Sequence, residues 1–306
     1  MNTPIRIGTR NSELALWQAH LVQDQLENLG YATSIVEISS TGDEILDTPL
    51  HKIGGMGLFT KTLDLAMLQG KIDIAVHSLK DVPTDLPETI VQAAVLERAE
   101  LQDVLIHKGD LNFLNESDSL IATGSLRRKA QWLNRYPNHK VTDLRGNVNT
   151  RLQKLNDNAW NGAIFAMAGL QRIKLLPKNH TVLDWMIPAP AQGAIMVTAL
   201  ENKKDVLEAC EQLNHRETEI AVGVERQFMK ILEGGCTAPI GGKAIIKEGV
   251  IYFKGILSAL DGSEKIEIEK TTSLSNYIDF GKQCALQVLK DGGKELMQAI
   301  KSEMKG

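Results

Sequence analysis

A lysine and an aspartate, Lys80 and Asp81, follow a short apolar run in the first third of the chain. The run, residues 72–76, is rich in β-branched side chains and is typical of a buried strand in a parallel sheet, and Pro83 prevents its continuation. Because ligands of open α/β sheets bind outside the carboxyl ends of the strands, Asp81 is a candidate carboxylate over a ligand, kept ionised by the neighbouring cation. An ordinary surface ion pair in a turn explains the same two residues, and this alternative stays open.

Basic residues gather in one segment of an otherwise acidic chain. Residues 122–174 contain ten Lys/Arg and two acidic residues, whereas the rest of the chain contains 24 basic and 36 acidic residues, a net charge of −12. Three predicted strands, residues 120–123, 140–144 and 162–167, are each followed by arginines. These arginines are Arg127, Arg128, Arg145, Arg151 and Arg172. Because the ends of parallel strands lie side by side, the sequence predicts an arginine rim that binds carboxylates or phosphates, with solvated helix faces as the alternative.

Of the three cysteines, Cys236 lies in a loop-like stretch, G-G-C-T-A-P-I-G-G. Glycines allow a ligand to approach the backbone, and an exposed thiol can act as a nucleophile. An incidental loop cysteine explains the pattern equally well. Cys210 and Cys284 fall within helical patterns, which indicates core positions. No C-x-x-C pair and no metal-ligand spacing of histidines occurs, so we expect neither a disulfide framework nor a metal site.

The pattern of strands and helices predicts that α/β units position these candidate residues. Residues 4–9 and 32–39 are predicted strands on either side of an amphipathic helix, which makes a βαβ unit. Arg10 and Ser12 fall at the turn from strand to helix, where backbone N–H groups and the helix dipole favour an anion. Helix capping explains Ser12 equally well. Residues 40–58 are rich in glycine and are predicted to form a mobile loop that could act as a lid.

Two halves of similar organisation and a C-terminal part of different character predict three domains. In each half strands alternate with helices, and a proline-containing connector, residues 188–194, leads to a strand that returns to the first half. The C-terminal part has strands joined by a hairpin turn at 261–263, which favours an antiparallel sheet. We therefore expect an α/β fold of two lobes of periplasmic-binding-protein-like topology with a ligand cleft between them, plus a small C-terminal α+β domain with an antiparallel sheet. The predicted domains are residues 1–98 with 194–213, residues 99–193, and residues 214–306.

Seven motifs together resemble those of the hydroxymethylbilane synthase family, also called porphobilinogen deaminases. They occur in order along nearly the whole chain: I-G-T-R-N-S-E-L-A-L-W-Q-A (7–19), T-G-D-E-I-L-D (41–47), H-S-L-K-D-V-P (77–83), S-L-R-R (125–128), D-L-R-G-N-V-N-T-R-L (143–152), P-A-Q-G-A (190–194) and G-G-C-T-A-P-I-G (234–241). The resemblance implies a transferase of tetrapyrrole (haem-type) biosynthesis. Such an enzyme deaminates four porphobilinogen molecules and condenses them head to tail on a covalent dipyrromethane primer, and hydrolysis releases hydroxymethylbilane.

The same resemblance implies a role for each candidate residue. Asp81 matches the family's catalytic carboxylate, and Cys236 matches the cysteine that holds the dipyrromethane cofactor through a thioether. The implied cofactor-binding residues are Lys80, Asp81, Ser125, Arg127 and Arg128. The implied substrate-binding residues are Arg10, Ser12, Gln18, Arg145, Arg151 and Arg172. Two positions depart from the family pattern, because Met56 stands where the family has a lysine and Gly124 stands where it often has a serine.

Composition and charge narrow the possible partners. No apolar run is long enough to span a membrane, and residues 1–6 lack a signal-peptide pattern. We therefore expect a cytoplasmic protein, monomeric as the resemblance implies, with a small-molecule substrate and no membrane partner. The basic segment lacks interleaved aromatic residues, which argues against nucleic acid. The alternative is a non-catalytic two-lobed protein that binds a small carboxylate, but this gives Cys236 and the third domain no role and predicts export.

Overall fold

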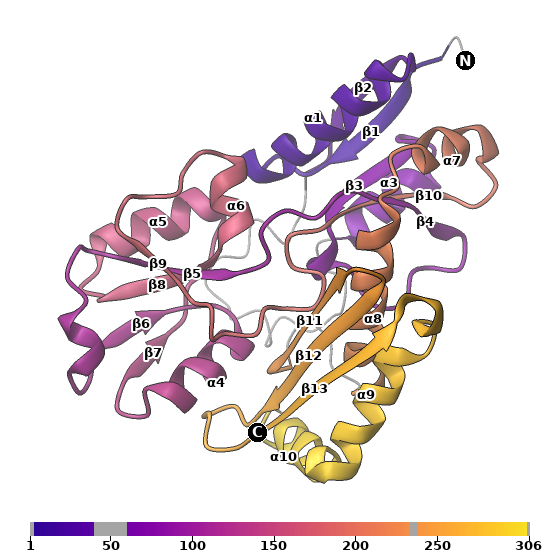
Figure 1. Ribbon diagram of the computed structural model, residues 1–306. Coiled ribbons are helices and arrows are strands. Elements are labelled where there is room, and N and C mark those ends of the chain that lie inside the picture. Colours follow the sequence, from indigo (N-terminus) through magenta and orange to yellow (C-terminus); the bar gives the residue numbers. More distant parts are fainter. Residues whose placement is uncertain (1–2, 40–59, 233–237, 305–306) are drawn as a thin grey trace. The chain divides into compact units, whose positions relative to one another are not determined.

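Two compact units make up the part of the chain that the computed structural model describes, which comprises residues 3–39, 60–232 and 238–304 (Figure 1). Unit 1 holds residues 3–39, 60–99 and 193–219, and unit 2 holds residues 100–192 and the described residues from 220 onwards. Unit 1 contains a five-stranded sheet, and unit 2 contains a five-stranded and a three-stranded sheet. None of the helices in the described residues is long and apolar enough to cross a membrane.

The sheet of unit 1 has the strand order β2-β1-β3-β10-β4. Its strands are β1 (Ile5–Thr9), β2 (Thr33–Glu37), β3 (Ile74–Ser78), β4 (Ile90–Val95) and β10 (Ile195–Leu200). Its helices are α1 (Glu13–Asn28), α3 (Lys61–Leu68) and α7 (Lys204–Glu211), with the 3-10 helix η1 (Leu79–Asp81) directly after β3. Buried Val22 and Leu26 of α1 belong to the same apolar cluster as Ile7 of β1 and Ile74 of β3, which fixes α1 on the sheet.

The first sheet of unit 2 repeats this arrangement, with the order β7-β6-β8-β5-β9. Its strands are β5 (Asp103–His107), β6 (Leu120–Ala122), β7 (Lys140–Thr142), β8 (Gly162–Ala166) and β9 (His180–Val182). Its helices are α4 (Leu126–Arg135), α5 (Val148–Asp157) and α6 (Met167–Arg172), with the 3-10 helix η2 (Asn112–Asn115). In both sheets three parallel strands, ordered second, first, third, are followed by an antiparallel strand and an edge strand. The expectation of two similarly organised α/β lobes is confirmed.

The parallel pairing expected for β1, β2 and β3 is confirmed, but both five-stranded sheets are mixed rather than wholly parallel. Strand β10 runs antiparallel to β3, and β5 runs antiparallel to β8. A parallel neighbour requires a crossover connection, which usually contains a helix. Strand β10 follows the connector 188–194 and β5 follows the polar stretch after β4, and neither of these described connections contains a helix. Strand β9 was not predicted, because three residues that include a histidine and a threonine are too short and polar to give a strand pattern.

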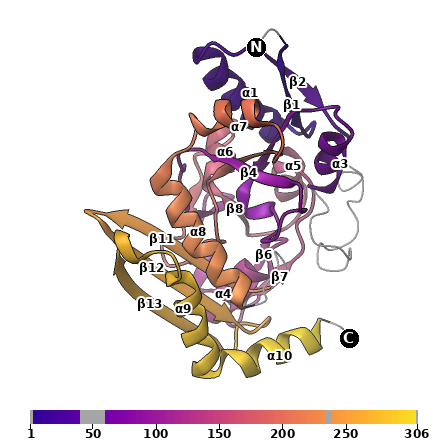
Figure 2. The same ribbon diagram turned by 90° about the vertical axis from the view of Figure 1, so that its right-hand side faces the viewer.

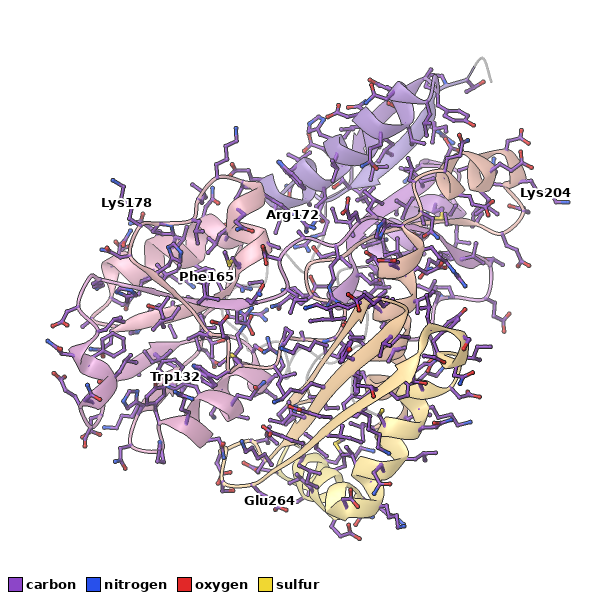
Figure 3. The ribbon with its side chains drawn as sticks, viewed as in Figure 1. Trp132, Phe165, Arg172, Lys178, Lys204 and Glu264 are labelled. Carbon is purple, nitrogen blue, oxygen red and sulfur yellow. The ribbon has the colours of Figure 1, made fainter. Side chains whose placement is uncertain are left out.

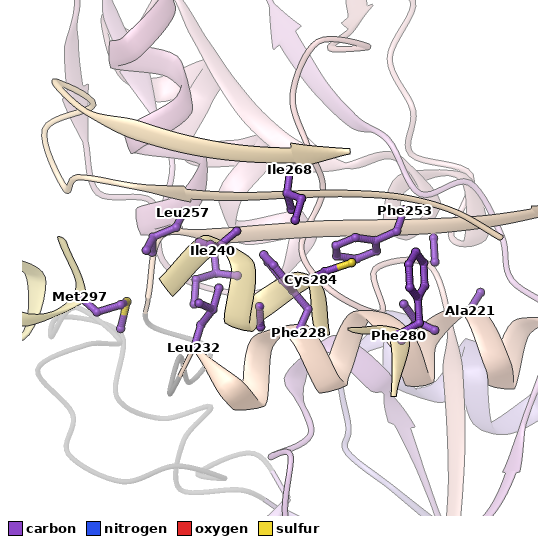
Figure 4. Close-up of a cluster of buried hydrophobic side chains, with 14 of the residues drawn as sticks. Ala221, Phe228, Leu232, Ile240, Phe253, Leu257, Ile268, Phe280, Cys284 and Met297 are labelled. Carbon is purple, nitrogen blue, oxygen red and sulfur yellow. The ribbon is translucent and has the colours of Figure 1, made fainter. Parts of the chain in front are cut away.

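The third sheet is antiparallel, as predicted, with the order β11-β12-β13. Its strands are β11 (Ile240–Lys247), β12 (Val250–Ser258) and β13 (Lys265–Ser273). Around it lie α8 (Arg216–Ile231), η3 (Leu274–Asn276), α9 (Phe280–Val288), the π-helical segment η4 (Leu289–Gly293) and α10 (Lys294–Glu303). Figures 1 and 2 show α8 and α9 along one face of this sheet. Phe253 lies between Phe228 and Phe280, with ring centroids 5.0 and 6.3 Å away in edge-on geometry (Figure 4).

The tip of the β12–β13 hairpin rests on α4, and Gly262 leaves no room for a side chain there. Asn134 Nδ2 donates to Gly262 O at 2.8 Å, and a Cβ on Gly262 would lie 2.5 Å from Ala130 O. We expect Gly262→Ala to lower the free energy of unfolding by about 1–3 kcal/mol, because overpacking adds to the strain of its positive φ. Urea denaturation measures this change.

Gly249→Ala is the matched control for this prediction. Gly249 has nearly the same φ as Gly262, +75° against +77°, but no atom lies within 4 Å of the position that a Cβ would take there. The Gly262 variant must therefore lose clearly more stability than the Gly249 variant. Equal losses would assign the effect to backbone strain and contradict the contact with α4.

Candidate functional site

Asp81 lies in a turn that two buried apolar side chains fasten to unit 1. Strand β3 ends at Ser78 and passes directly into η1, whose Leu79 is fully buried and donates its N–H to Ala194 O at 3.0 Å. Val82, also fully buried, donates its N–H to Leu79 O at 3.2 Å. Lys80 is half-buried and Asp81 is exposed between these anchors. The carboxylate is therefore held on a turn at the end of a strand, as the sequence predicted, and it is accessible.

The other unit 1 candidates lie on or before α1. Ser12 caps α1, since its Oγ accepts from Ala15 N at 3.4 Å, so the capping interpretation is confirmed. Gln18 is buried, and its Nε2 donates to Ser78 Oγ at 2.8 Å, which ties α1 to the strand end that precedes Asp81. Arg10 is half-buried and acts electrostatically on His77, a buried residue of β3 that sequence reasoning did not select. Its position in the H-S-L-K-D-V-P motif was the available signal.

His77 makes the stability of unit 1 depend on pH. Burial, aided by the positive charge of Arg10, lowers the pKa of His77 from 6.5 to about 4, and its Nε2 lies 3.3 Å from Thr198 Oγ1. A depressed histidine pKa means that the unfolded chain binds more protons, so this stabilisation is complete above about pH 6.5 and is lost as the pH falls towards 4. We expect a loss of about 3 kcal/mol over this window, and a smaller slope for His77→Gln. Urea denaturation from pH 7 to 4 measures both slopes, and equal slopes would contradict the assignment.

In unit 2, Arg127 and Arg128 converge on a buried carboxylate. Asp103, the first residue of β5, is fully buried, and the two arginines are 4% and 5% exposed. Arg127 Nη1 lies 2.7 Å from Asp103 Oδ2, and Arg128 Nη2 lies 2.7 Å from Oδ1. Burial raises the pKa of Asp103, but Arg127, Arg128 and Gln192 outweigh burial and hold the pKa below its ordinary value. Ser125 caps α4, since its Oγ accepts from Arg128 N at 3.5 Å.

This arrangement contradicts the alternative of solvated helix faces for these two arginines. They come from the first turn of α4, as expected, but they point to the interior because the carboxylate of Asp103 lies there. Asp103 was missed as a site residue, although a charged residue that opens the apolar strand D-V-L-I-H was a visible signal.

The remaining arginines follow strands β7 and β8. Strands β6, β7 and β8 are neighbouring and parallel, so their carboxyl ends lie at one edge of the sheet, as predicted. Arg145 is 8% exposed, and burial lowers its pKa although Asp143 opposes the shift. Arg151 donates through Nε to Gly146 O at 2.7 Å. Arg172 ends α6 (Figure 3), and burial lowers its pKa to about 10.

Gly124 has a steric role at this edge. A Cβ on Gly124 would lie 2.5 Å from Leu144 O and 4.0 Å from Arg145 Cδ. The serine that the family often has here would therefore require the main chain at the end of β7 to shift. In this chain Gly124 therefore allows the main chain at Leu144 to lie against it.

Two buried guanidinium nitrogens fit a carboxylate ligand. Arg127 Nε and Arg145 Nη1 have no hydrogen-bond partner among the residues described. Unsatisfied buried donors are costly, and a ligand carboxylate would satisfy them with charge-assisted hydrogen bonds. In the described ranges no group of three or more His, Cys, Asp or Glu side chains could hold a metal ion.

The thiols of Cys210 and Cys284 are both buried. Burial raises the pKa of Cys210 to about 12 and that of Cys284 to about 11, so neither is a thiolate at neutral pH. The core positions predicted for both are confirmed. Cys236, Met56 and the predicted loop 40–58 lie outside the described residues.

Comparison with known proteins covers nearly the whole chain. Residues 5–208 match the family model described as porphobilinogen deaminase, dipyromethane cofactor binding domain, and residues 220–290 match its C-terminal domain. The porphobilinogen deaminase of Campylobacter fetus subsp. fetus is 42% identical over 298 residues, covering 96% of this chain and 97% of that protein. The chloroplastic enzyme of Oryza sativa subsp. japonica is 42% identical over 302 residues, 95% of this chain and 83% of that protein. The solved methionine-binding protein MetQ aligns at 15% identity with a TM-score of 0.45, over 68% of this chain and 89% of that chain. From both family models and these relatives, the chain belongs to the porphobilinogen deaminase family.

Proposed function

We propose that this chain is a hydroxymethylbilane synthase, which deaminates four porphobilinogen molecules and condenses them head to tail before hydrolysis releases the product. The observation that supports this most is the carboxylate of Asp81, held on η1 by Leu79 and Val82 and yet exposed. It stands in the H-S-L-K-D-V-P motif, inside the region that matches the cofactor-binding domain of the family.

Asp81 is the proposed catalytic residue. Loss of ammonia from the aminomethyl group of porphobilinogen leaves positive charge on the pyrrole, and a nearby carboxylate stabilises that charge electrostatically. The same carboxylate can accept hydrogen bonds from pyrrole N–H groups. It can also take a proton from the condensed ring carbon, and the carboxylic acid formed in this way can give that proton to the next leaving amine.

The cofactor of the family is dipyrromethane, and we propose that Cys236 holds it. When bound, this group supplies a nucleophilic pyrrole carbon and a covalent tether. The two other thiols have raised pKa values and are buried in helices, which leaves Cys236 as the thiol able to form the thioether. The unsatisfied donors on Arg127 and Arg145 suit its acetate and propionate groups.

The proposed allocation of the other site residues follows their chemistry. Lys80, Ser125, Arg127 and Arg128 bind the cofactor, and Lys80 stands next to Asp81 in the chain. The incoming porphobilinogen and the growing chain are polycarboxylates, for which the guanidinium group has matching geometry. The residues proposed to bind them are Arg10, Ser12, Gln18, Arg145, Arg151 and Arg172.

Ammonia release tests the proposed function against non-catalytic carboxylate binding. Incubation of the purified protein with porphobilinogen should release one ammonia for each porphobilinogen consumed, with many turnovers for each protein. A carboxylate-binding protein would take up porphobilinogen in proportion to its own concentration and release no ammonia. The monomeric state and the cytoplasmic location expected from the sequence are also proposals, and light scattering on the purified protein tests the first.

A further inference from the structure

One fully buried carboxylate organises both arginines of α4. We call Asp103, Arg127 and Arg128 the arginine–aspartate cluster. Besides its contact with Arg127, Asp103 accepts at Oδ1 from Arg128 Nε at 3.0 Å and Nη2 at 2.7 Å. Main-chain oxygens complete the arrangement, because Ile187 O accepts from Arg127 Nη1 and Ile164 O accepts from Arg128 Nη1, both at 2.9 Å. Each guanidinium group is thus fixed by two separate segments of unit 2.

The carboxylate of Asp103 is itself held in place by the connector. Gln192 Nε2 donates to Asp103 Oδ1 at 2.9 Å and to Leu101 O at 2.8 Å. The preceding residue, Ala191, has a φ of +62°, which is rare for a residue with a Cβ, and its N–H donates to Glu225 Oε2 at 2.6 Å. Glu225 Oε1 accepts from Ala244 N of β11, also at 2.6 Å. The cluster is therefore linked by hydrogen bonds to α8 and β11.

The cluster carries an excess of positive charge. One carboxylate serves two guanidinium groups, so the three side chains have a net charge of +1. Arg127 Nε, nine-tenths buried or more, has no partner within the described part of the chain. A buried, ordered and incompletely compensated cation of this kind suits one further carboxylate group.

We propose that Asp103 is a positioning residue, which holds Arg127 and Arg128 in the arrangement that receives a carboxylate of a pyrrole ligand. The inference rests on the proposed function, in which that ligand is the dipyrromethane formed from porphobilinogen. Asp103 is not a catalytic residue, because it is fully buried and its oxygens are occupied by Arg127, Arg128 and Gln192.

Charge and positioning predict opposite effects of Asp103→Asn, which makes the variant informative. The substitution keeps the shape of the side chain and changes the cluster from +1 to +2. If Asp103 acted only through its negative charge, removal of that charge would strengthen the attraction of the cluster for a ligand carboxylate. If Asp103 positions the arginines, the asparagine amide repels one guanidinium group, and the ordered pair is lost although the site becomes more positive.

The test is the rate at which cofactor-free protein takes up its covalent adduct. Wild type and variants are purified from cells that cannot make porphobilinogen, incubated with porphobilinogen, and sampled by intact mass, with circular dichroism as the measure of folding. We expect Asp103→Asn to load at least about tenfold more slowly than wild type with an unchanged spectrum. The control is Asp118→Asn, which breaks the exposed pair with Lys140 in the same unit and suits the positive φ of residue 118. It should load at the wild-type rate.

A folded Asp103→Asn protein that loads as fast as wild type, or faster, overturns the inference. If this variant does not fold, the loading rate of Gln192→Met tests the inference, since this substitution removes one hydrogen-bond donor to Asp103 and leaves the charges of the cluster unchanged. Slower loading of that folded variant supports the positioning role, and unchanged loading overturns it. Failure of wild type itself to load contradicts the proposed function instead, so the two failures are distinguishable.

Discussion

Asp81→Asn is expected to abolish turnover of porphobilinogen while the protein remains folded. The side chain is exposed on η1, and the turn is held by Leu79 and Val82, so an isosteric amide leaves the packing unchanged. The amide can neither carry a proton nor stabilise positive charge. Loss of a general acid–base group that also acts electrostatically costs about 10²–10⁴-fold in rate. Release of ammonia per protein per minute is the measurement, with the urea midpoint as the measure of folding.

Asp85→Asn is the control for this experiment. Asp85 follows four residues later in the same stretch of chain, is also exposed, and has no assigned role. It should retain the wild-type rate. An Asp81→Asn protein with a rate near that of wild type would overturn the assignment of Asp81, and equal losses in both variants would point to a general effect of charge.

Cys236→Ala is expected to remove the covalent cofactor completely. Intact mass of the wild-type protein should show an increment equal to two linked pyrrole units derived from porphobilinogen, and the variant should show none. A thioether needs a thiolate nucleophile, and the alanine methyl group offers no alternative. Turnover should fall with the increment, because elongation without a tether loses the advantage of holding the reacting groups together.

Cys284→Ala is the matched control, because this thiol is buried and its pKa is raised to about 11. The control should keep the full increment. If Cys236→Ala kept the increment and Cys284→Ala lost it, the anchor would be assigned wrongly. A wild-type protein without the increment must acquire it on incubation with porphobilinogen, and a protein that binds carboxylates without chemistry would not.

The elements around the site could be predicted well from local patterns. The buried run before Asp81 became β3, and the strands before Arg127 and Arg145 became the neighbouring parallel strands β6 and β7. The capping role considered for Ser12 marked the start of α1, whereas the capping role of Ser125 at α4 was found only in the structure. The direction of β5 and β10 could not be predicted, because it depends on how the chain enters each sheet and not on the strand's own residues.

The sequence by itself determined which residues carry charge, which are able to act as nucleophile or acid, and where each stands relative to a strand end. Periodicity and capping are local, and the motifs depend on order alone, so both can be read without coordinates. The position of Asp81 directly after a strand was predicted on this basis, since Pro83 and the polar residues after β3 had to leave the sheet.

Only the tertiary structure decided which charges meet. Asp103 lies 24 and 25 residues before its two arginines and 89 before Gln192, and no local pattern relates them. Their pairing depends on β5 lying next to β8 in the sheet and on the connector returning past its first residue. A buried carboxylate is stable only where donors surround it, and donors from distant segments are brought together by packing of the whole unit. For that reason the sequence placed Arg127 and Arg128 after a strand end, but it did not predict that the folded unit holds them inside around Asp103.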